Sequence, residues 1–426
     1  MKKILLRILR FLSKKIIKKY KPKIIGITGS VGKTTSKNAI YEVLKNRYKT
    51  RMSPKNYNNE LGLPLTIMNL ETSNNIFGWA INILKGIKLL VKTDKNYPEI
   101  LILEMGADKP GDISYLNTIV KPDIAILTQI SPAHLEKFDN LDNVLKEKLE
   151  IFNTGDSNQK AILNIDNSLI KKSQTDIDAD VITYGIEKDA DITAFNINSH
   201  NTFDDDYTSG VEFDLKYKNE NIHVKMQYLL GKHQIYSVLA AFTVGIIFDL
   251  TLENIKDSLE DTKPQNGRMS LVKGIKNTWI IDDTYNSSPI ACISALEVLS
   301  ASSVLGKKIA VLGDMLELGA STESEHKRVG YRVQDLDLDL LITVGERSRD
   351  IARGALEAGM DENNVFMFSG EKEAGKFIQN RIKQNDLILV KGSQGVRCEK
   401  IVKEIMAEPL NAKNLLVRQT GMWENN

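Results

Sequence analysis

"KIIGITGSVGKTT", residues 23–35, joins an apolar run to a glycine-rich loop and the start of a helical pattern. A strand, a glycine-rich loop and a helix in this order bind phosphate, because N–H groups at the helix N-terminus point at the anion. The loop fits G-x-x-x-x-G-K-[ST] except that the first glycine falls on Ile27. In such loops the lysine reaches the β- and γ-phosphates and the hydroxyl binds Mg²⁺. The predicted nucleotide-binding residues are Gly29, Ser30, Val31, Gly32, Lys33, Thr34 and Thr35.

Strands and helices alternate after this loop, which is typical of a parallel sheet with helices on both faces. Residues 191–228 change to short alternating runs such as "VEFDLKY" and predict antiparallel hairpins, and a small-residue helix is expected at 237–248. We therefore expect a central P-loop ATPase domain with a mostly parallel sheet. Its expected parallel strands are 23–28, 99–105, 123–128, 160–164 and 181–184.

A second α/β series follows a polar link at 264–267 and has a Rossmann-like pattern. The length of 426 residues is enough for two or three domains. We expect an α/β protein with a basic amphipathic leader at 1–22, a central ATP-binding domain at 23–266 and a C-terminal Rossmann-like domain at 267–426. The expected strands of the last part are 278–282, 308–312, 340–344, 365–368 and 387–391.

Charge separates the leader from the rest of the chain. Residues 1–23 carry ten basic side chains and no acidic one, which leaves 47 basic and 55 acidic residues elsewhere. An acidic body argues against a nucleic-acid-binding protein. Two cysteines, Cys292 and Cys398, cannot form a disulfide framework, and no Cys/His cluster has zinc spacing. The cytoplasm, a reducing compartment, is the expected location.

The leader has apolar residues at roughly helical spacing between its charges. The charges leave no run long enough to span a bilayer, and no signal-peptide pattern is present. Two interpretations stay open: residues 1–20 lie as an amphipathic helix on an anionic membrane surface, or they pack on the body or a partner. A second apolar stretch at 76–91 carries Lys85 and Lys88 and is compatible with a core helix or with a second surface contact, and of these we expect the core helix.

Two further side chains follow predicted strands. Glu104 ends the apolar run 99–104, and a carboxylate at the C-terminal end of a neighbouring parallel strand can reach the Mg²⁺ of a nucleotide. His134 lies in "TQISPAHLEKF", residues 128–138, directly after the next strand. Taken alone, Glu104 is equally compatible with a solvated position in a loop, and a lone histidine such as His134 is usually structural.

These elements occur together in the order found in the Mur ligase family, the ATP-dependent amide-forming enzymes of peptidoglycan synthesis, which the chain resembles. The resemblance covers about residues 23–405 and is strongest to the MurF branch, which joins D-alanyl-D-alanine to a UDP-linked muramyl tripeptide. The further matching strings are "NYNNELGLPLT" (56–66), "LEMGADKPGDI" (103–113), "KEKLEIF" (146–152), "DDTYNSSP" (282–289), "VLGDMLELG" (311–319) and "VKGSQGVRCE" (390–399).

The resemblance implies an ATP- and Mg²⁺-dependent ligase of cell-wall biogenesis, and through it a role in cell shape and cell division. The peptide carboxylate would attack the γ-phosphate to give an acyl phosphate, and the dipeptide amine would then displace phosphate. This chemistry needs positioning and charge neutralisation more than a protein nucleophile. The implied partners are a UDP-linked muramyl peptide and D-alanyl-D-alanine, with no nucleic acid, and we favour a monomer.

The resemblance also assigns roles to residues. Lys33 and Arg268 would contact the transferred phosphate, and Thr34 with Glu104 would hold one Mg²⁺. His134 and Lys148 would serve a second Mg²⁺, Lys148 as a carbamate formed with CO₂, although its sequence context alone makes it one charge on a solvated helix. Further nucleotide contacts are implied for His233 and Asp283. Substrate contacts are implied for Asn58, Asn59, Asn286, His326 and Lys391.

The chain departs from the family pattern in several places. About 22 residues precede the P-loop strand, where the family usually carries a uridine-binding domain, so we expect that surface to be reduced, replaced or supplied by another chain. Gln234 and Ser237 stand where the family favours asparagine, and Gln394 where arginine is usual. Two alternatives stay open: a membrane-tethered nucleotide-binding protein without ligase activity, and a ligase for a pseudomurein-type or lipid-linked peptide.

Overall fold

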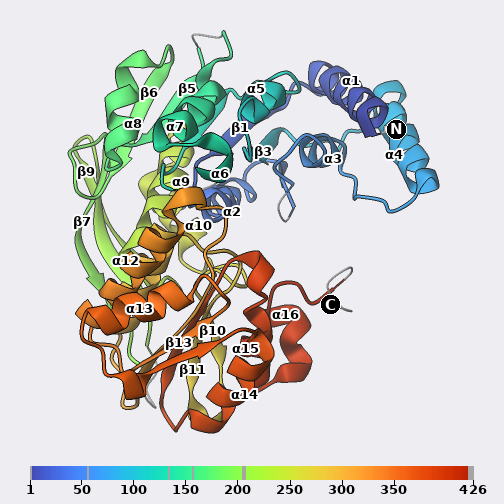
Figure 1. Ribbon diagram of the computed structural model, residues 1–426. Helices are drawn as coiled ribbons and strands as arrows, with labels where there is room; N and C mark the ends of the chain where they lie inside the picture. The colour runs from blue at the N-terminus through green and yellow to red at the C-terminus, as the bar shows by residue number, and fades with distance from the viewer. Residues whose placement is uncertain (1, 55–56, 133–134, 156–157, 204–207, 421–426) are drawn as a thin grey trace.

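Two α/β units, each built on its own sheet, make up the structure, a computed structural model that describes residues 2–54, 57–132, 135–155, 158–203 and 208–420. Figure 1 shows the first unit above the second, with the N-terminal helices at one end of the first unit. The sheets have nine and six strands in the part of the chain described. The expected α/β class, with a mostly parallel first sheet and a second sheet, is confirmed.

The first sheet has the strand order β2-β3-β1-β4-β5-β6-β7-β8-β9. Strands β2 to β7 pair in parallel, and β7, β8 and β9 pair antiparallel, as the alternating runs predict. Its strands are β1 (Lys23–Thr28), β2 (Thr50–Met52), β3 (Ile100–Glu104), β4 (Ile124–Leu127), β5 (Lys160–Asn164), β6 (Asp180–Gly185), β7 (Ile192–Ser199), β8 (Val211–Tyr217) and β9 (Glu220–Met226).

Helices cover both faces of this sheet. Side chains alternate across the faces of a strand, so Ile25 and Ile27 of β1 pack with α2, α9 and α10, whereas Ile24 packs on the other face with α1, α3, α5 and α7. The helices are α1 (Lys2–Tyr20), α2 (Lys33–Leu44), α3 (Gly62–Met68), α4 (Ile76–Val91), α5 (Asp112–Asn117), α6 (Leu135–Phe138), α7 (Leu141–Leu149), α8 (Ser168–Ser173), α9 (Ile235–Ile247) and α10 (Leu252–Leu259).

Helix α1 agrees with one of the two interpretations left open for it, whereas α4 differs from its expectation. Helix α1 packs on the body, where it buries Leu9, Leu12 and Ile16 in the core beneath it. The expected core helix at 76–91 is wrong: α4 buries only Asn82 and Gly86 and turns most of its apolar side chains outward. Among the described residues, no helix is both long enough and apolar enough to cross a membrane.

The second sheet has the order β10-β11-β15-β12-β13-β14, and only β10 is antiparallel to its neighbour. Its strands are β10 (Ser270–Lys273), β11 (Trp279–Asp283), β12 (Lys308–Gly313), β13 (Leu340–Val344), β14 (Val365–Phe368) and β15 (Leu387–Lys391). Its helices are α11 (Pro289–Ala301), α12 (Thr322–Asp335), α13 (Arg349–Glu357), α14 (Glu371–Arg381), α15 (Glu399–Ile405) and α16 (Ala412–Leu415).

The strand order decides where chemistry can occur. Strands β3 and β4 flank β1 in register, so β1, β3 and β4 end at one edge of the sheet. The crevice at the carboxyl ends of parallel strands is where such sheets bind ligands. The glycine-rich loop, Glu104 and the segment after β4 therefore meet at this edge.

Candidate functional site

The glycine-rich loop has a backbone that requires glycine at Gly29 and favours it at Gly32. Both have positive φ angles, +146° and +88°. A Cβ on Gly29 would lie 2.0 Å from the Oγ1 atom of Thr128, whereas Gly32 has room and begins α2 as its N-cap. The loop thus approaches the segment after β4 closely and leads directly into α2. This is the geometry that a phosphate site needs.

The segment after β4 holds the loop from the other side. The Oγ1 atom of Thr128 donates to the carbonyl oxygen of Val31 at 2.7 Å, and the N–H of Ser30 donates to the carbonyl oxygen of Gln129 at 2.6 Å. The Ser30 hydroxyl donates to the Ser131 carbonyl at 3.1 Å. These bonds fix the loop before any ligand arrives, so little of its backbone needs to be ordered on binding.

Lys33, the first residue of α2, folds back onto the loop. Its Nζ atom donates to the carbonyl oxygens of Gly29 at 2.6 Å and Ser30 at 3.3 Å. Burial lowers the pKa of Lys33, and the positive charge of Arg268 adds to this effect, whereas Glu104 opposes it. Both of these acceptors are neutral carbonyls, so an anion in the loop can take over these contacts.

Glu104 ends β3 and is almost fully buried beside Thr34. Its Oε2 atom accepts a hydrogen bond from the Thr34 hydroxyl at 3.0 Å, and its Oε1 atom lies 3.4 Å from the side-chain nitrogen of Asn58. Burial alone raises the pKa of this carboxyl, but the charges of Lys37, Lys33 and Arg268 outweigh burial and hold it below its usual value. Glu104 is therefore a buried carboxylate.

Lys37 is a site residue that the sequence did not reveal. It lies one turn after Lys33, is fully buried, and places its Nζ atom 3.4 Å from the Oε2 atom of Glu104. The same atom donates to the carbonyl oxygen of Ser53 at 2.8 Å. Two lysines four residues apart on a helix are normally assigned to a solvated face, so the spacing of Lys33 and Lys37 did not indicate a buried position for Lys37.

Arg268 brings the second unit to the loop. Its Nη2 atom donates to the Thr34 hydroxyl at 3.1 Å, and its guanidinium carbon lies 4.0 Å from the ring centre of Tyr285. The buried Nε atom has no hydrogen-bond partner among the described residues. This unpartnered N–H group of a guanidinium, next to a phosphate-binding loop, is suited to bind an anion.

Oxygen ligands for a divalent cation are present at the same place. The Thr34 hydroxyl and the Glu104 carboxylate, already 3.0 Å apart, are hard donors of the kind that Mg²⁺ prefers. Within the described ranges, no group of three or more His, Cys, Asp or Glu side chains is arranged to hold a metal. His134 lies outside the described residues. The donor chemistry therefore fits one Mg²⁺ shared with a phosphate ligand.

Lys148 is buried in α7, which the solvated-helix interpretation does not predict. Burial and the nearby charge of Lys33 lower the pKa of Lys148 to about 7. Its neighbour Glu147 accepts backbone N–H bonds from Gly111 and Ile113, both at 2.7 Å, and so fixes the start of α5.

The carboxyl ends of β11 and β15 hold a second polar group. The Nζ atom of Lys391 lies 2.6 Å from the Oδ2 atom of Asp283 and donates to the carbonyl oxygen of Asn286 at 3.0 Å. His233 lies within electrostatic reach of Asp283 and Lys391, and burial lowers the pKa of this histidine to about 4. Asp283, Lys391 and His233, which are predicted contact residues, thus lie near one another, and His233 is neutral.

His326 is held by the protein itself. It is fully buried, its Nδ1 atom lies 2.6 Å from the Thr322 carbonyl oxygen, and its Nε2 atom accepts the N–H of Met315 at 3.0 Å. A substrate contact through this ring stays a prediction that requires one of these bonds to break.

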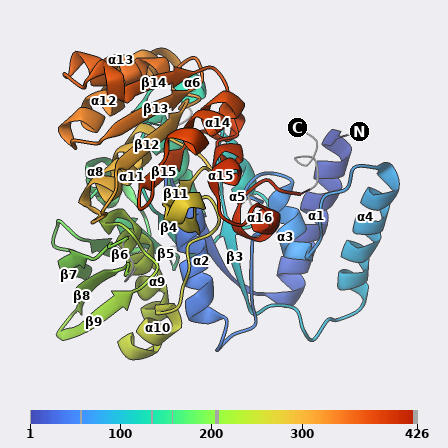
Figure 2. The ribbon, with the colours of Figure 1, turned by 90° about the horizontal axis from the view of Figure 1, so that it is seen from below.

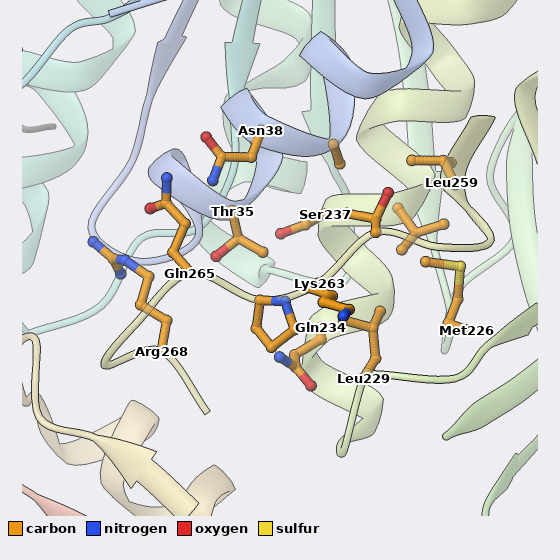
Figure 3. Close-up of a pocket in the computed structure, with 14 residues that line it drawn as sticks. Thr35, Asn38, Met226, Leu229, Gln234, Ser237, Leu259, Lys263, Gln265 and Arg268 are labelled. Atoms are coloured by element: carbon orange, nitrogen blue, oxygen red, sulfur yellow. The ribbon is translucent and has the colours of Figure 1, made fainter. Parts of the chain in front are cut away.

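A narrow pocket of about 30 Å³ lies beside the loop, between α2 and α9 (Figure 3). Thr35 and Asn38 line one side and Gln234 and Ser237 the other. Gln234 uses its Oε1 atom to accept the backbone N–H groups of Leu230 and Gly231, at 2.8 and 3.2 Å. The departure from asparagine at this position therefore has a local structural use.

A second cavity, of about 760 Å³, is lined by α1 and by residues that follow β3, among them 108–112. Asn58 connects this cavity to Glu104, since it lines the cavity and its side chain also reaches the Glu104 carboxylate. Asn59 lines the cavity as well, but its Oδ1 atom accepts the N–H of Gly62 at 3.0 Å and so holds the turn into α3. Helix α1 closes the far side of the cavity with Lys3, Leu6, Arg7 and Arg10.

The buried pair Lys37–Glu104 generates a stability prediction. We expect Lys37→Met to lower the free energy of unfolding by about 3 kcal/mol, because it leaves a buried carboxylate with one cation fewer. Urea denaturation measures this loss. The matched control is Lys45→Met, which breaks the half-exposed pair with Glu42 at the C-terminal end of the same helix and should cost less than about 1 kcal/mol. Equal losses in the two variants would contradict the assignment.

Comparisons with known proteins agree with this site. Family models match residues 27–79 and 80–245 as the Mur ligase middle domain and residues 267–394 as the Mur ligase, glutamate ligase domain. The UDP-N-acetylmuramoyl-tripeptide–D-alanyl-D-alanine ligase of Bacillus subtilis is 29% identical over 95% of this chain and 80% of that protein. The enzyme of the same name from Buchnera aphidicola subsp. Baizongia pistaciae is 31% identical over 90% of this chain and 75% of its own length.

Solved structures point the same way. A MurF ligase from Thermotoga maritima in complex with ADP is 26% identical and superposes with a TM-score of 0.77, over 96% of this chain and 84% of that chain. The sequence matches span both sheet-based units, and the structural match extends over nearly the whole chain. This chain belongs to the Mur ligase family.

Proposed function

We propose that this protein is an ATP-dependent ligase that joins D-alanyl-D-alanine to the free carboxylate of a UDP-linked muramyl peptide. The names of the similar proteins from Bacillus subtilis and Buchnera aphidicola support this activity. The observation that carries the proposal is the contact of Thr34 with both Glu104 and Arg268. It joins an anion-binding loop, a buried carboxylate and a cation from the second unit.

The proposed reaction has two steps. A carboxylate oxygen of the peptide bonds to the γ-phosphorus of ATP, the bond from that phosphorus to the β,γ-bridging oxygen breaks, and ADP leaves. The amine nitrogen of the dipeptide then attacks the acyl carbon, phosphate leaves with the electrons of the C–O bond, and the nitrogen releases a proton to solvent. Lys33 and Arg268 supply positive charge where the transferred phosphoryl group is held.

Mg²⁺ belongs to this proposal, and Thr34 and Glu104 are the residues that would hold it. The ion would neutralise phosphate charge. Carbamylation of Lys148 is a further part: its neutral amine nitrogen would bond to the carbon of CO₂ and lose a proton. The product would place an anion near Lys33, whose positive charge acts on Lys148. His134 is proposed as a partner of the carbamate at a second ion.

The pocket between α2 and α9 is proposed to take the adenine base. Met226, Leu229 and Val238 give it an apolar wall beside the polar group of Gln234 and Ser237. Asp283 and His233 are proposed to face the ribose. Because the pocket is narrow, the linker residues 263–265 that line it would have to move when the base enters.

The larger cavity is proposed to hold the muramyl peptide. It reaches Glu104 through Asn58, so a carboxylate there would point at the phosphate site. Lys3, Arg7 and Arg10 line its far side, where the diphosphate of a UDP-linked substrate would need positive charge. Asn286, His326 and Lys391 are proposed on the dipeptide side. A cytoplasmic location, a monomer and a membrane contact through residues 1–20 also remain proposals.

The ligase proposal predicts how phosphate release depends on substrates. We expect phosphate release only when ATP, Mg²⁺, a UDP-linked muramyl tripeptide and D-alanyl-D-alanine are all present. The peptide carboxylate must first accept the phosphoryl group, and the dipeptide amine must then displace it as phosphate. A coupled phosphate assay that omits one component at a time measures this. Release that ignores both peptide substrates would favour a nucleotide-binding protein without ligase activity. Release only with a lipid-linked or pseudomurein-type peptide would favour the other alternative.

Carbamylation predicts a rescue experiment. We expect Lys148→Ala to lower turnover by about a thousandfold, since the carbamate that would hold the second Mg²⁺ would be lost, and added acetate or formate to restore part of it. The control is Lys146→Ala, two residues earlier on α7 and exposed, which should keep full activity. Full activity of Lys148→Ala without a carboxylate would remove the carbamate from the mechanism.

The cavity predicts a specific kinetic change. Arg7→Glu should raise KM for the UDP-linked muramyl peptide about tenfold, because it reverses one charge facing the diphosphate, and should leave KM for ATP and the dipeptide unchanged. Steady-state kinetics with each substrate varied in turn measures this. Lys172→Glu on α8, also exposed, is the control. A parallel rise in all three KM values would show general damage instead.

A further inference from the structure

Helix α4 presents an unusual face to solvent. Six large apolar side chains are between 41% and 83% exposed: Ile76, Phe77, Ile81, Leu84, Ile87 and Val91. A surface helix of a globular protein normally turns its apolar stripe toward the core. A concentration of this kind on one helix marks a contact site, unlike the isolated apolar residues common on protein surfaces.

The orientation of α4 is fixed by its inner side. A Cβ on Gly86 would lie 2.7 Å from the Met68 sulfur and 3.0 Å from a Leu12 methyl, so α4 packs tightly on α3 and α1. The Nδ2 atom of Asn82 donates to the carbonyl oxygen of Glu71 at 2.8 Å. The apolar face cannot turn inward without losing these contacts.

Helix α1 secures the C-terminal end of α4. Lys19 Nζ donates to the carbonyl oxygens of Leu89 and Leu90 at 2.9 and 3.0 Å, and the Tyr20 hydroxyl donates to that of Leu89 at 2.9 Å. Tyr20 also stacks on Tyr97, with 4.0 Å between ring centres. Figure 2 shows α4 along the outer edge of the molecule, beyond α1 and away from the second unit.

The charged side chains on α1 and α4 all have one sign. Neither α1 nor α4 contains an acidic residue. Lys85, Lys88 and Lys92 are exposed on or just after α4, and Lys14 and Lys15 are exposed on α1. A second copy of the chain would bring lysines against lysines, whereas apolar side chains flanked by lysines fit the headgroup and acyl boundary of an anionic bilayer.

We propose that the exposed apolar face of α4, flanked by the lysines of α4 and α1, docks this protein on the surface of an anionic lipid bilayer. Leu9, Leu12 and Ile16 of α1 are buried, and of its large apolar side chains only Ile4 and Phe11 are exposed, so α4 provides most of the inserting surface and α1 supplies mainly charge. The contact is peripheral, because neither helix has the length and hydropathy to span a bilayer. This inference does not depend on the ligase function.

Vesicle binding tests the proposal with the full chain. We expect the protein to float with vesicles of phosphatidylglycerol and phosphatidylcholine, and to bind pure phosphatidylcholine vesicles about tenfold less. Binding should weaken at about 0.5 M salt, where exposed charges are screened. A protein that stays unbound in the anionic mixture would overturn the proposal. So would a dimer that buries this face, detected by analytical ultracentrifugation without vesicle binding.

Matched variants separate the contribution of the apolar side chains to vesicle binding from that of the lysines. Phe77→Ser with Leu84→Ser, and separately Lys85→Glu with Lys88→Glu, should each lower vesicle binding about tenfold without changing the midpoint of thermal unfolding. The controls carry the same changes on the second unit: Leu356→Ser with Leu410→Ser, and Lys372→Glu with Lys376→Glu, all at exposed positions. Equal binding by the α4 variants and the controls would overturn the assignment of the surface.

A fluorescent label reports insertion directly. Both native cysteines, Cys292 and Cys398, are buried, so Leu84→Cys can be labelled selectively with an environment-sensitive dye. We expect the emission to shift to the blue when anionic vesicles are added, and the same label on Leu356→Cys to stay unchanged. A label at position 84 that remains in a water-like environment on bound protein would show that α4 does not insert.

Discussion

The buried carboxylate of Glu104 is the constraint on which the phosphate site depends. An unpaired carboxylate in this position would be costly, so the chain surrounds it with Lys37, the Thr34 hydroxyl and the charges of Lys33 and Arg268. These groups come from α2 and from the second unit. The charge that can bind a cation therefore also fixes the P-loop helix and draws the two units together. Binding and folding use the same contacts here.

The contact of Arg268 with Thr34 gives this arrangement a mechanical consequence. The guanidinium spans from the start of the second unit to the first turn of α2, and it stacks on Tyr285 near the end of β11. A nucleotide in the loop would compete for both the Thr34 hydroxyl and the guanidinium. The position of the second unit would then depend on which ligand the loop holds. This is how closure of one domain over another can be coupled to ligand binding.

Much of this could be predicted because it is local in sequence. The expected parallel strands and the hairpins of β7, β8 and β9 were confirmed, since apolar runs and turn residues lie next to one another in the chain. The short strands β2 and β10 were missed because three or four residues carry too little pattern. Lys37 could not be found, because its role depends on a carboxylate 67 positions away in the chain. The roles predicted for the site residues remain predictions.

Helix α4 shows what an apolar sequence pattern does not determine. An apolar period predicts which side chains share a face, but not which way that face points. The direction was decided by Gly86, which fits against α1 and α3, and by Asn82, which bonds to the connection between α3 and α4, while six large apolar residues remained outside. Helix α1 then has three distinct sides: one buried in the core, one lining the substrate-sized cavity with Arg7 and Arg10, and one holding α4. Helix α1 would therefore contact both the docking helix α4 and a ligand in the cavity.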